Sequence, residues 1–253
     1  MSVPKGEVKR VADALLGRIL SREYPASLRL PPESALAEEF ACGRSTVREA
    51  LRHVASMGLV QSRQGSGATV LDFRREGTPA LIPRYLEIGR FDVDPATMAR
   101  EMLRLRTLMA TEAVRLAASY TRAEDLEHAK QLIEAGAELE DDPAAHAHNE
   151  LETYRELVMA SGMWPAVWMV NALFTPLEEI NSRLAPLLPP VHKGWRRAMK
   201  RMVRAIESQD EVAAIAEVNK WFARVDKELI GQIEVALAAA GLTPAAASEG
   251  VNR

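Results

Sequence analysis

The 253-residue sequence predicts a mainly α-helical protein, with an N-terminal winged helix-turn-helix domain that carries a small β-hairpin and a C-terminal antiparallel bundle of six or seven helices. Three observations predict this class. Apolar residues recur at helical spacing through most of the chain. Strand-like runs are confined to 59–62 and 68–71. Residues 1–75 hold 12 Lys and Arg against 8 Asp and Glu, a net of +4, whereas the remaining 178 hold 20 against 27, a net of −7.

This charge asymmetry is more informative than the overall net charge of −3. A small basic part joined to a larger acidic part indicates a nucleic-acid or membrane partner for the basic part, although chance variation of a few charges gives the same figures. Cys42 is the single cysteine, which excludes a disulfide framework and a thiolate zinc site. Because no apolar run approaches the roughly 20 residues that span a bilayer, and the first ten residues lack a signal-peptide core, we expect a cytoplasmic protein without a membrane partner.

The first 72 residues are expected to form one domain. Its predicted elements are a helix over 7–21, a helix over 33–40, a turn at 41–43, a helix over 44–57 and a hairpin over 59–71. Prolines between the first two helices stop helix formation, and Gly58 is suited to end the third helix. The two strands are joined by a basic, glycine-rich tip, Arg63-Gln64-Gly65-Ser66-Gly67.

The third helix carries the residues that would contact DNA. In a winged helix this helix enters the major groove with its N-terminal residues nearest the bases. Arg44 and Arg48 lie one turn apart, and an arginine can hold guanine O6 and N7 with two hydrogen bonds. Ser45 and Thr46 can donate to a phosphate or a base edge. The alternative is a solvated basic helix face beside a loose loop.

Beyond residue 72 the pattern changes. Residues 73–95 contain three prolines and little periodicity, which predicts a linker with one short helix near 80–89. Residues 96–242 are strongly helical, and their short connections favour antiparallel neighbours. The last residues, 243–253, are small and polar and are expected to form a flexible tail.

Several stretches of the N-terminal part form a specific set: Leu30-Pro31-Pro32-Glu33-Ser34-Ala35-Leu36-Ala37, Arg44-Ser45-Thr46-Val47-Arg48-Glu49-Ala50-Leu51, Gly58-Leu59-Val60 and Gly65-Ser66-Gly67. In this order, over residues 7–71, they resemble the GntR family of bacterial transcription regulators. The resemblance implies contacts with double-stranded DNA from Arg44, Ser45, Thr46, Arg48, Gln64 and Gly65. Ser34 stands where the family commonly has an arginine that contacts DNA. A serine can reach a phosphate but cannot make a bidentate base contact.

The helical part resembles the effector-binding domain of the FadR-type branch of that family, over roughly residues 95–235. Most domains of this branch hold a divalent metal with one Asp or Asn and three His. The matching positions here are Glu150, Tyr154, Met199 and Trp221. A tyrosine is a poor ligand at neutral pH, methionine is soft, and tryptophan cannot bind a metal. We therefore expect neither a metal nor a cofactor.

The same positions favour an organic effector. Tyr154, Met199 and Trp221 offer apolar surface, a phenol and an indole N–H, which suit a ligand such as a fatty-acyl-CoA or another carboxylate. Arg106 matches a position where the family often has an arginine in the effector cavity. A buried arginine needs an anionic partner, which could be the ligand or Glu150. Alternatively, Arg106 lies at the surface. Asn171 is a further candidate for the pocket, or it caps a helix or faces solvent. In the alternative, the bulky side chains fill the cavity and no effector binds.

These observations together predict a sequence-specific transcription regulator that is not an enzyme. We expect a homodimeric repressor that binds a pseudo-palindromic operator and responds to a small organic effector. Two other hypotheses remain: a metal- or carboxylate-responsive sensor that uses Glu150 with non-standard ligands, and an enzyme tethered to a DNA-binding domain. No nucleophile–base pair, phosphate-binding loop or HExxH motif supports the enzyme.

Overall fold

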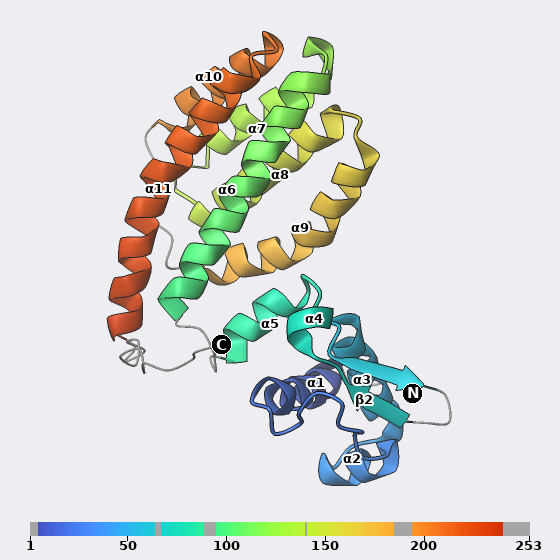
Figure 1. Cartoon of the computed structure of the whole chain (residues 1–253). Helices are drawn as coiled ribbons and strands as arrows, with labels where there is room; N and C mark the ends of the chain where they lie inside the picture. The colour runs from blue at the N-terminus through green and yellow to red at the C-terminus, as the bar shows by residue number, and fades with distance from the viewer. Residues whose placement is uncertain (1–4, 64–66, 89–94, 140, 185–193, 240–253) are drawn as a thin grey trace, which may run out of the picture. The chain divides into compact units, whose positions relative to one another are not determined.

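The computed structural model describes residues 5–63, 67–88, 95–139, 141–184 and 194–239. The chain divides into two compact units, Met1–Arg90 and Phe91–Arg253, whose helices and strands are drawn in Figure 1. Each unit has its own hydrophobic core. The described residues are mainly helical, with one two-stranded antiparallel sheet, which confirms the predicted fold class. The predicted tail, 243–253, lies outside the described residues.

The N-terminal unit begins with the elements of a winged helix-turn-helix. These are α1 (Lys5–Leu20), α2 (Glu33–Glu39), α3 (Arg44–Ser56), β1 (Val60–Arg63) and β2 (Gly67–Val70). The two strands pair antiparallel, with Val60 opposite Val70. Arg29, which precedes α2, forms an isolated bridge with Thr69 on β2 and so ties the connection between α1 and α2 to the hairpin.

Helix α3 is divided into a buried face and an exposed face. The buried residues are Thr46, Val47, Ala50, Leu51 and Val54. They pack in one core with α1 and α2. Because residues three and four apart share one side of a helix, burial of this apolar face turns Arg44, Ser45 and Arg48 outward.

Two helices occupy the segment predicted to be a linker: α4 (Phe73–Glu76) and α5 (Leu81–Ile88). The second agrees with the short helix expected near 80–89. The segment is attached to the N-terminal unit, since Leu81 is buried in its core and the Thr78 hydroxyl donates to the Ser56 carbonyl oxygen at 3.1 Å. The compact N-terminal unit therefore includes this segment and extends to Arg90, because the apolar residues of the segment pack on its core.

The C-terminal unit is an antiparallel helical bundle. Its helices are α6 (Pro95–Tyr120), the 3-10 turn η1 (Ala123–Leu126), α7 (Glu127–Ala137), α8 (Pro143–Ala160), α9 (Trp164–Leu184), α10 (Trp195–Glu207) and α11 (Glu211–Ala239). Helix α6 packs along α11, α7 packs on α8, and α8 packs on α9. Figure 1 shows that α9 is bent, and Pro176 inside it is the residue that interrupts its backbone hydrogen bonding. Within the described ranges, no helix has the length and apolar character needed to cross a bilayer.

Trp195, the first residue of α10, is the largest fully buried side chain of the C-terminal unit. Its ring lies edge-on to His146 of α8, with centroids 4.5 Å apart. On the other side it approaches Gly136 of α7 so closely that a Cβ built there would lie 2.6 Å from a ring carbon of Trp195 and 2.3 Å from Oδ1 of Asn149. The absence of a side chain at Gly136 therefore allows α7, α8 and α10 to pack around one indole.

Gly136→Ala is expected to destabilise the C-terminal unit by about 1–3 kcal/mol, because the added methyl overpacks the site around Trp195. The matched control is Gly231→Ala in α11, where a Cβ would meet no atom within 4 Å. There the better helix propensity of alanine should stabilise the protein by about 0.5–1 kcal/mol. Urea unfolding followed by circular dichroism measures both; stabilisation by both substitutions would contradict the packing described.

Candidate nucleic-acid interface and helical-domain site

The N-terminus of α3 presents the candidate DNA-contacting side chains. Gly43 precedes the helix in an extended conformation, with φ −76° and ψ 150°, and Arg44 is its first residue. Arg44, Ser45 and Arg48 are exposed and lie within the first five residues of the helix. The unpaired N–H groups of a helix N-terminus and its dipole favour an anion such as a phosphate. The arrangement therefore brings two guanidinium groups, a hydroxyl and a positive helix end to one surface.

Arg48 is held by an acidic residue of α2. Its Nε lies 3.2 Å from both carboxylate oxygens of Glu33, and its Nη2 donates to Oε2 at 2.7 Å. The Arg48 guanidinium lowers the pKa of Glu33, so this carboxyl stays ionised. Glu33 was not among the site residues predicted from the sequence, where its only signal was its place beside Ser34 at the start of the predicted second helix. An exposed pair of this kind adds little stability, but it restricts the direction of the Arg48 side chain.

Thr46 is buried, unlike the exposed Ser45 beside it. It is 3% exposed, and its hydroxyl lies 3.5 Å from a carboxylate oxygen of Glu7 in α1. A side-chain contact from Thr46 to DNA, as expected from the sequence, is therefore at odds with the geometry, because the apolar face of α3 carries this residue into the core. Ser34 is exposed on α2. Gln64 and Gly65 lie outside the described residues.

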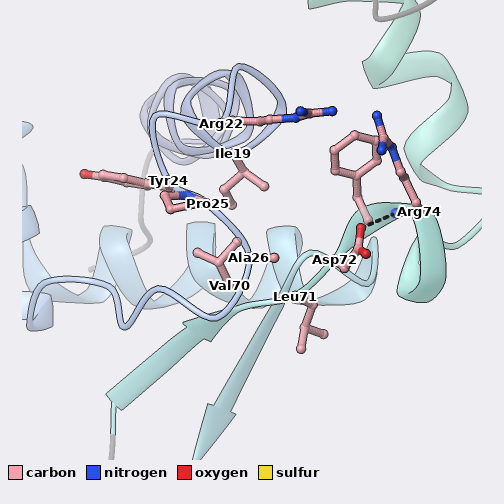
Figure 2. Close-up of a pocket in the computed structure, with 10 residues that line it drawn as sticks. Ile19, Arg22, Tyr24, Pro25, Ala26, Val70, Leu71, Asp72 and Arg74 are labelled. Atoms are coloured by element: carbon pink, nitrogen blue, oxygen red, sulfur yellow. Dashed lines mark hydrogen bonds between the residues drawn. The ribbon is translucent and has the colours of Figure 1, made fainter. Parts of the chain in front are cut away.

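A small pocket of about 160 Å³ lies in the N-terminal unit, between the end of α1 and the residues that follow β2 (Figure 2). Ile19, Ala26 and Val70 contribute apolar surface to it, and Asp72 caps α4 by accepting a hydrogen bond from the Arg74 backbone N–H at 3.1 Å. Organic ligands of drug size usually occupy about 300–1,000 Å³. This pocket is too small for such a ligand, and it contains none of the predicted effector residues.

In the C-terminal unit, the four positions matched to metal ligands come together. Glu150 accepts hydrogen bonds at its Oε1 from two indoles, Trp195 at 2.9 Å and Trp221 at 3.3 Å. The Tyr154 hydroxyl lies 3.9 Å from the sulfur of Met199. Tyr154, Met199 and Trp221 all belong to the buried core of the bundle. Burial raises the pKa of Tyr154 well above its ordinary value, and the charge of Glu150 raises it further.

Arg106 lies at the edge of this cluster. It forms an ion pair with Asp226 of α11, and its guanidinium carbon is 4.3 Å from the centroid of the Phe222 ring. Of the anionic partners considered from the sequence, Glu150 is therefore not the one that pairs with Arg106. The Nε atom of Arg106 is buried and has no hydrogen-bond partner among the described residues. Burial raises the pKa of Asp226, with Arg106 opposing the shift and Glu150 reinforcing it.

The donor set around Glu150 does not fit a metal ion. One oxygen of its carboxylate already accepts from two indole N–H groups, and the other three matched side chains are a phenol, a thioether and an indole. Among the residues that the structure describes, no group of three His, Cys, Asp or Glu side chains could hold a metal. Asn171 is exposed on α9 and does not join the cluster.

We expect the purified protein to contain no stoichiometric metal, because a phenol, a thioether and an indole are weak donors for zinc or nickel. Elemental analysis of protein purified without chelators measures this directly. About one zinc or nickel ion per chain would show that the cluster rearranges around a metal through Glu150, and the sensor alternative would then stand.

A winged helix with an exposed basic recognition helix, followed by a helical bundle, defines a two-domain DNA-binding regulator. Comparison with known proteins agrees with this class. Residues 7–70 match the model of the bacterial regulatory proteins of the gntR family, and residues 101–223 match the FCD domain. The chain belongs to the GntR family of transcription regulators, in the branch that carries an FCD domain.

Individual relatives are regulators of the same kind. The chain is 32% identical to the HTH-type transcriptional regulator Mce2R of Mycobacterium tuberculosis over 193 residues, 76% of this chain and 77% of that protein. It is 28% identical to the HTH-type transcriptional repressor NanR of Shigella sonnei over 153 residues, 60% of this chain and 57% of that protein. A solved structure of Lar, which controls expression of the Listeria monocytogenes agr system, aligns with a TM-score of 0.53 at 19% identity, covering 91% of this chain and 98% of that one. The relatives are transcription regulators rather than enzymes, which argues against the hypothesis that the helical bundle is an enzyme tethered to a DNA-binding domain.

Proposed function

We propose that this protein is a homodimeric repressor that binds a pseudo-palindromic operator in the cytoplasm and releases it when a small organic anion binds the helical domain. The observation that carries the DNA-binding part is the exposed group Arg44, Ser45 and Arg48 at the start of α3. Two copies would place two such helices in successive major grooves, about 34–36 Å apart. A protein bound there excludes other proteins from the same DNA, which is the simplest form of repression.

The charge distribution supports this proposal. The N-terminal unit holds 14 Lys and Arg against 10 Asp and Glu, a net of +4, whereas the C-terminal unit holds 18 against 25, a net of −7. Phosphate contacts from lysine and arginine supply most of the sequence-independent affinity for DNA. The basic unit therefore provides attraction, and the acidic unit favours an orientation in which it stays away from the phosphates.

The effector part of the proposal rests on Arg106. Its side chain is 28% exposed, so a ligand can reach it, and its Nε has no partner among the described residues. Its present partner, Asp226, is a mostly buried carboxylate of α11, so an incoming carboxylate would compete with it for the same guanidinium. Because Asp226 lies on α11 and Arg106 on α6, exchanging the partner of Arg106 would loosen one link between the two helices.

The packing of the cluster beside Arg106 restricts the size of the effector that can bind. Tyr154, Met199 and Trp221 are packed in the core, so a long alkyl chain requires these side chains to move, whereas a short carboxylate does not. An effector that prefers the rearranged form weakens operator binding by its differential affinity for the two forms.

Selection of bound sequences from random DNA duplexes tests the DNA-binding part. We expect an enriched sequence with two inverted half-sites and a binding constant that falls steeply with salt, as counterion release requires. Fluorescence anisotropy with the selected duplex and a scrambled duplex measures the ratio of specific to non-specific affinity. Equal affinity for both duplexes would contradict the proposal.

A second assay tests the effector part separately. A short carboxylate, butyrate, and a long acyl chain, decanoyl-CoA, serve as probes, and release of the selected duplex is followed by anisotropy. We expect one of the two to weaken DNA binding at least about tenfold in the wild type, and Arg106→Ala to abolish the response. Arg204→Ala, which removes an exposed arginine of α10, is the matched control. If neither probe changes the affinity while operator binding is intact, the proposed carboxylate effector is wrong and the DNA-binding function stands.

A further inference from the structure

We propose that the outer face of α9 before Pro176 is the surface through which two copies of this chain associate, an inference that rests on the homodimer of the proposed function. The exposed residues of this part of α9 are Trp164, Pro165, Trp168, Met169, Asn171, Ala172 and Thr175. At 100° per residue they occupy roughly half of the helix circumference and form one continuous face. We call it the α9 face.

Its aromatic residues are unusually exposed. Trp164 is 60% exposed, Trp168 is 65% exposed and Met169 is 69% exposed. The sequence has only four tryptophans, and the other two, Trp195 and Trp221, are buried. Exposed apolar residues elsewhere, such as Leu108 on α6 and Val212 on α11, belong to different helices, and singly scattered residues of this kind need no partner. Two large rings one turn apart on one helix are a different case, because they form a contiguous apolar patch.

The area of the patch suits a dimer interface. A tryptophan buries about 150–250 Å², so two tryptophans and a methionine that are each about two-thirds exposed leave roughly 400 Å² of apolar surface. This is about half of the roughly 800 Å² that each partner contributes to a standard protein–protein interface. The remaining residues of the face and its rim can supply the other half.

The charge pattern identifies a second copy as the occupant. No Asp, Glu, Lys or Arg occurs from Trp164 to Leu177, although the C-terminal unit as a whole has a net charge of −7. A twofold axis brings the same patch of both subunits together, so charges of one sign near the axis meet charges of the same sign. Two acidic bundles can therefore approach closely at a face that carries no charge.

The polar residues of the face also suit a twofold contact. Asn171 and Thr175 each carry both a donor and an acceptor, so each can bond to its own copy across the axis. A lone asparagine in an apolar helix interface fixes the register of the partner helix. This gives a role to Asn171, which the structure places on the α9 face rather than beside Glu150.

The test compares two charge insertions by analytical ultracentrifugation. Trp168→Glu places like charges at the proposed twofold contact and is expected to weaken dimerisation roughly 100-fold, as loss of a central tryptophan anchor does. Val212→Glu makes the same kind of change at an exposed apolar residue of α11 and should leave the dimer unchanged. Because Trp168 is exposed, a folded Trp168→Glu monomer with wild-type circular dichroism is expected. The milder pair Trp164→Ala with Trp168→Ala removes the rings without adding charge and should also weaken the dimer.

Each outcome bears on the inference. A wild-type chain that is monomeric, or a Trp168→Glu chain that dimerises like the wild type, would overturn the α9 face as the interface. Binding of the wild type to the selected operator is measured in parallel. If the wild type shows no specific DNA binding, the proposed function is contradicted. If the wild type binds the operator and the Trp168→Glu variant still dimerises, only the assignment of the α9 face is contradicted.

Discussion

Arg48→Ala is expected to lower the affinity for the selected operator about 10- to 100-fold, because a bidentate contact between arginine and guanine contributes about 1–3 kcal/mol of discrimination. The side chain is exposed at the start of α3, so its removal leaves the core of the unit unchanged. The affinity for a scrambled duplex should fall much less, since it depends on phosphate contacts made by many cations. Anisotropy with both duplexes measures the two effects.

Arg48→Lys is the informative companion to this substitution. Lysine keeps the positive charge but cannot donate two parallel hydrogen bonds to one base edge or to Glu33. If Arg48 recognises a base, the lysine variant should lose nearly as much specificity as the alanine variant. If lysine restores full affinity, Arg48 contacts a phosphate and the base recognition belongs to another residue. Unchanged specific affinity in Arg48→Ala, with the protein folded, would exclude Arg48 from the interface altogether.

Gly58→Ala is expected to destabilise the N-terminal unit by about 2–4 kcal/mol, from the cost of a left-handed alanine together with overpacking. Gly58 ends α3 with a φ of +76°, and a Cβ at this position would lie 1.8 Å from the carbonyl oxygen of Glu76. That oxygen belongs to the backbone of α4, so relief of the clash must separate α4 from the end of α3. Thermal unfolding of the variant, followed by circular dichroism, measures the loss.

Gly17→Ala in α1 is the control for this prediction. A Cβ at Gly17 would meet no atom within 4 Å, and the residue lies within a helix, so alanine should stabilise the protein by about 0.5–1 kcal/mol. Equal effects of the two substitutions would show that the contact between Gly58 and Glu76 does not hold α4 in place. Weaker operator binding by Gly58→Ala in addition would connect the position of α4 with DNA recognition.

The elements of the fold were largely predictable from local pattern. Helical spacing of apolar residues predicted α1 and α3 to within a few residues, and one short helix was expected near α5. Gly58 was expected to end α3, as its positive φ confirms. The attachment of α4 and α5 to the N-terminal unit was not predictable in this way. It depends on Leu81 entering a core built from distant residues and on the Thr78 hydroxyl reaching Ser56, and no local periodicity reports such contacts.

Some residues of the candidate sites were likewise predictable from the sequence, and others were not. Matching positions to a family predicted that Glu150, Tyr154, Met199 and Trp221 lie close together. Trp221 donates to Glu150, the Tyr154 hydroxyl lies beside the Met199 sulfur, and the charge of Glu150 acts on Tyr154, so the four residues form one cluster. Trp195 was missed because it has no counterpart in that set of four, although its indole makes the shorter of the two bonds to Glu150. Asp226 was missed as the partner of Arg106 because 120 residues separate the two along the chain.

The sequence by itself determined the class of this protein: order, spacing and residue type predicted a winged helix with exposed arginines, followed by a helical bundle in which a tyrosine, a methionine and a tryptophan stand at three of the matched ligand positions. These properties depend on local periodicity and on which atoms each side chain carries. The tertiary structure alone decided which of those side chains are available. It buries Thr46 while Arg48 is held by Glu33, surrounds Glu150 with indoles, and leaves Trp164 and Trp168 at the surface, because burial and pairing depend on the packing of helices that are distant in the chain.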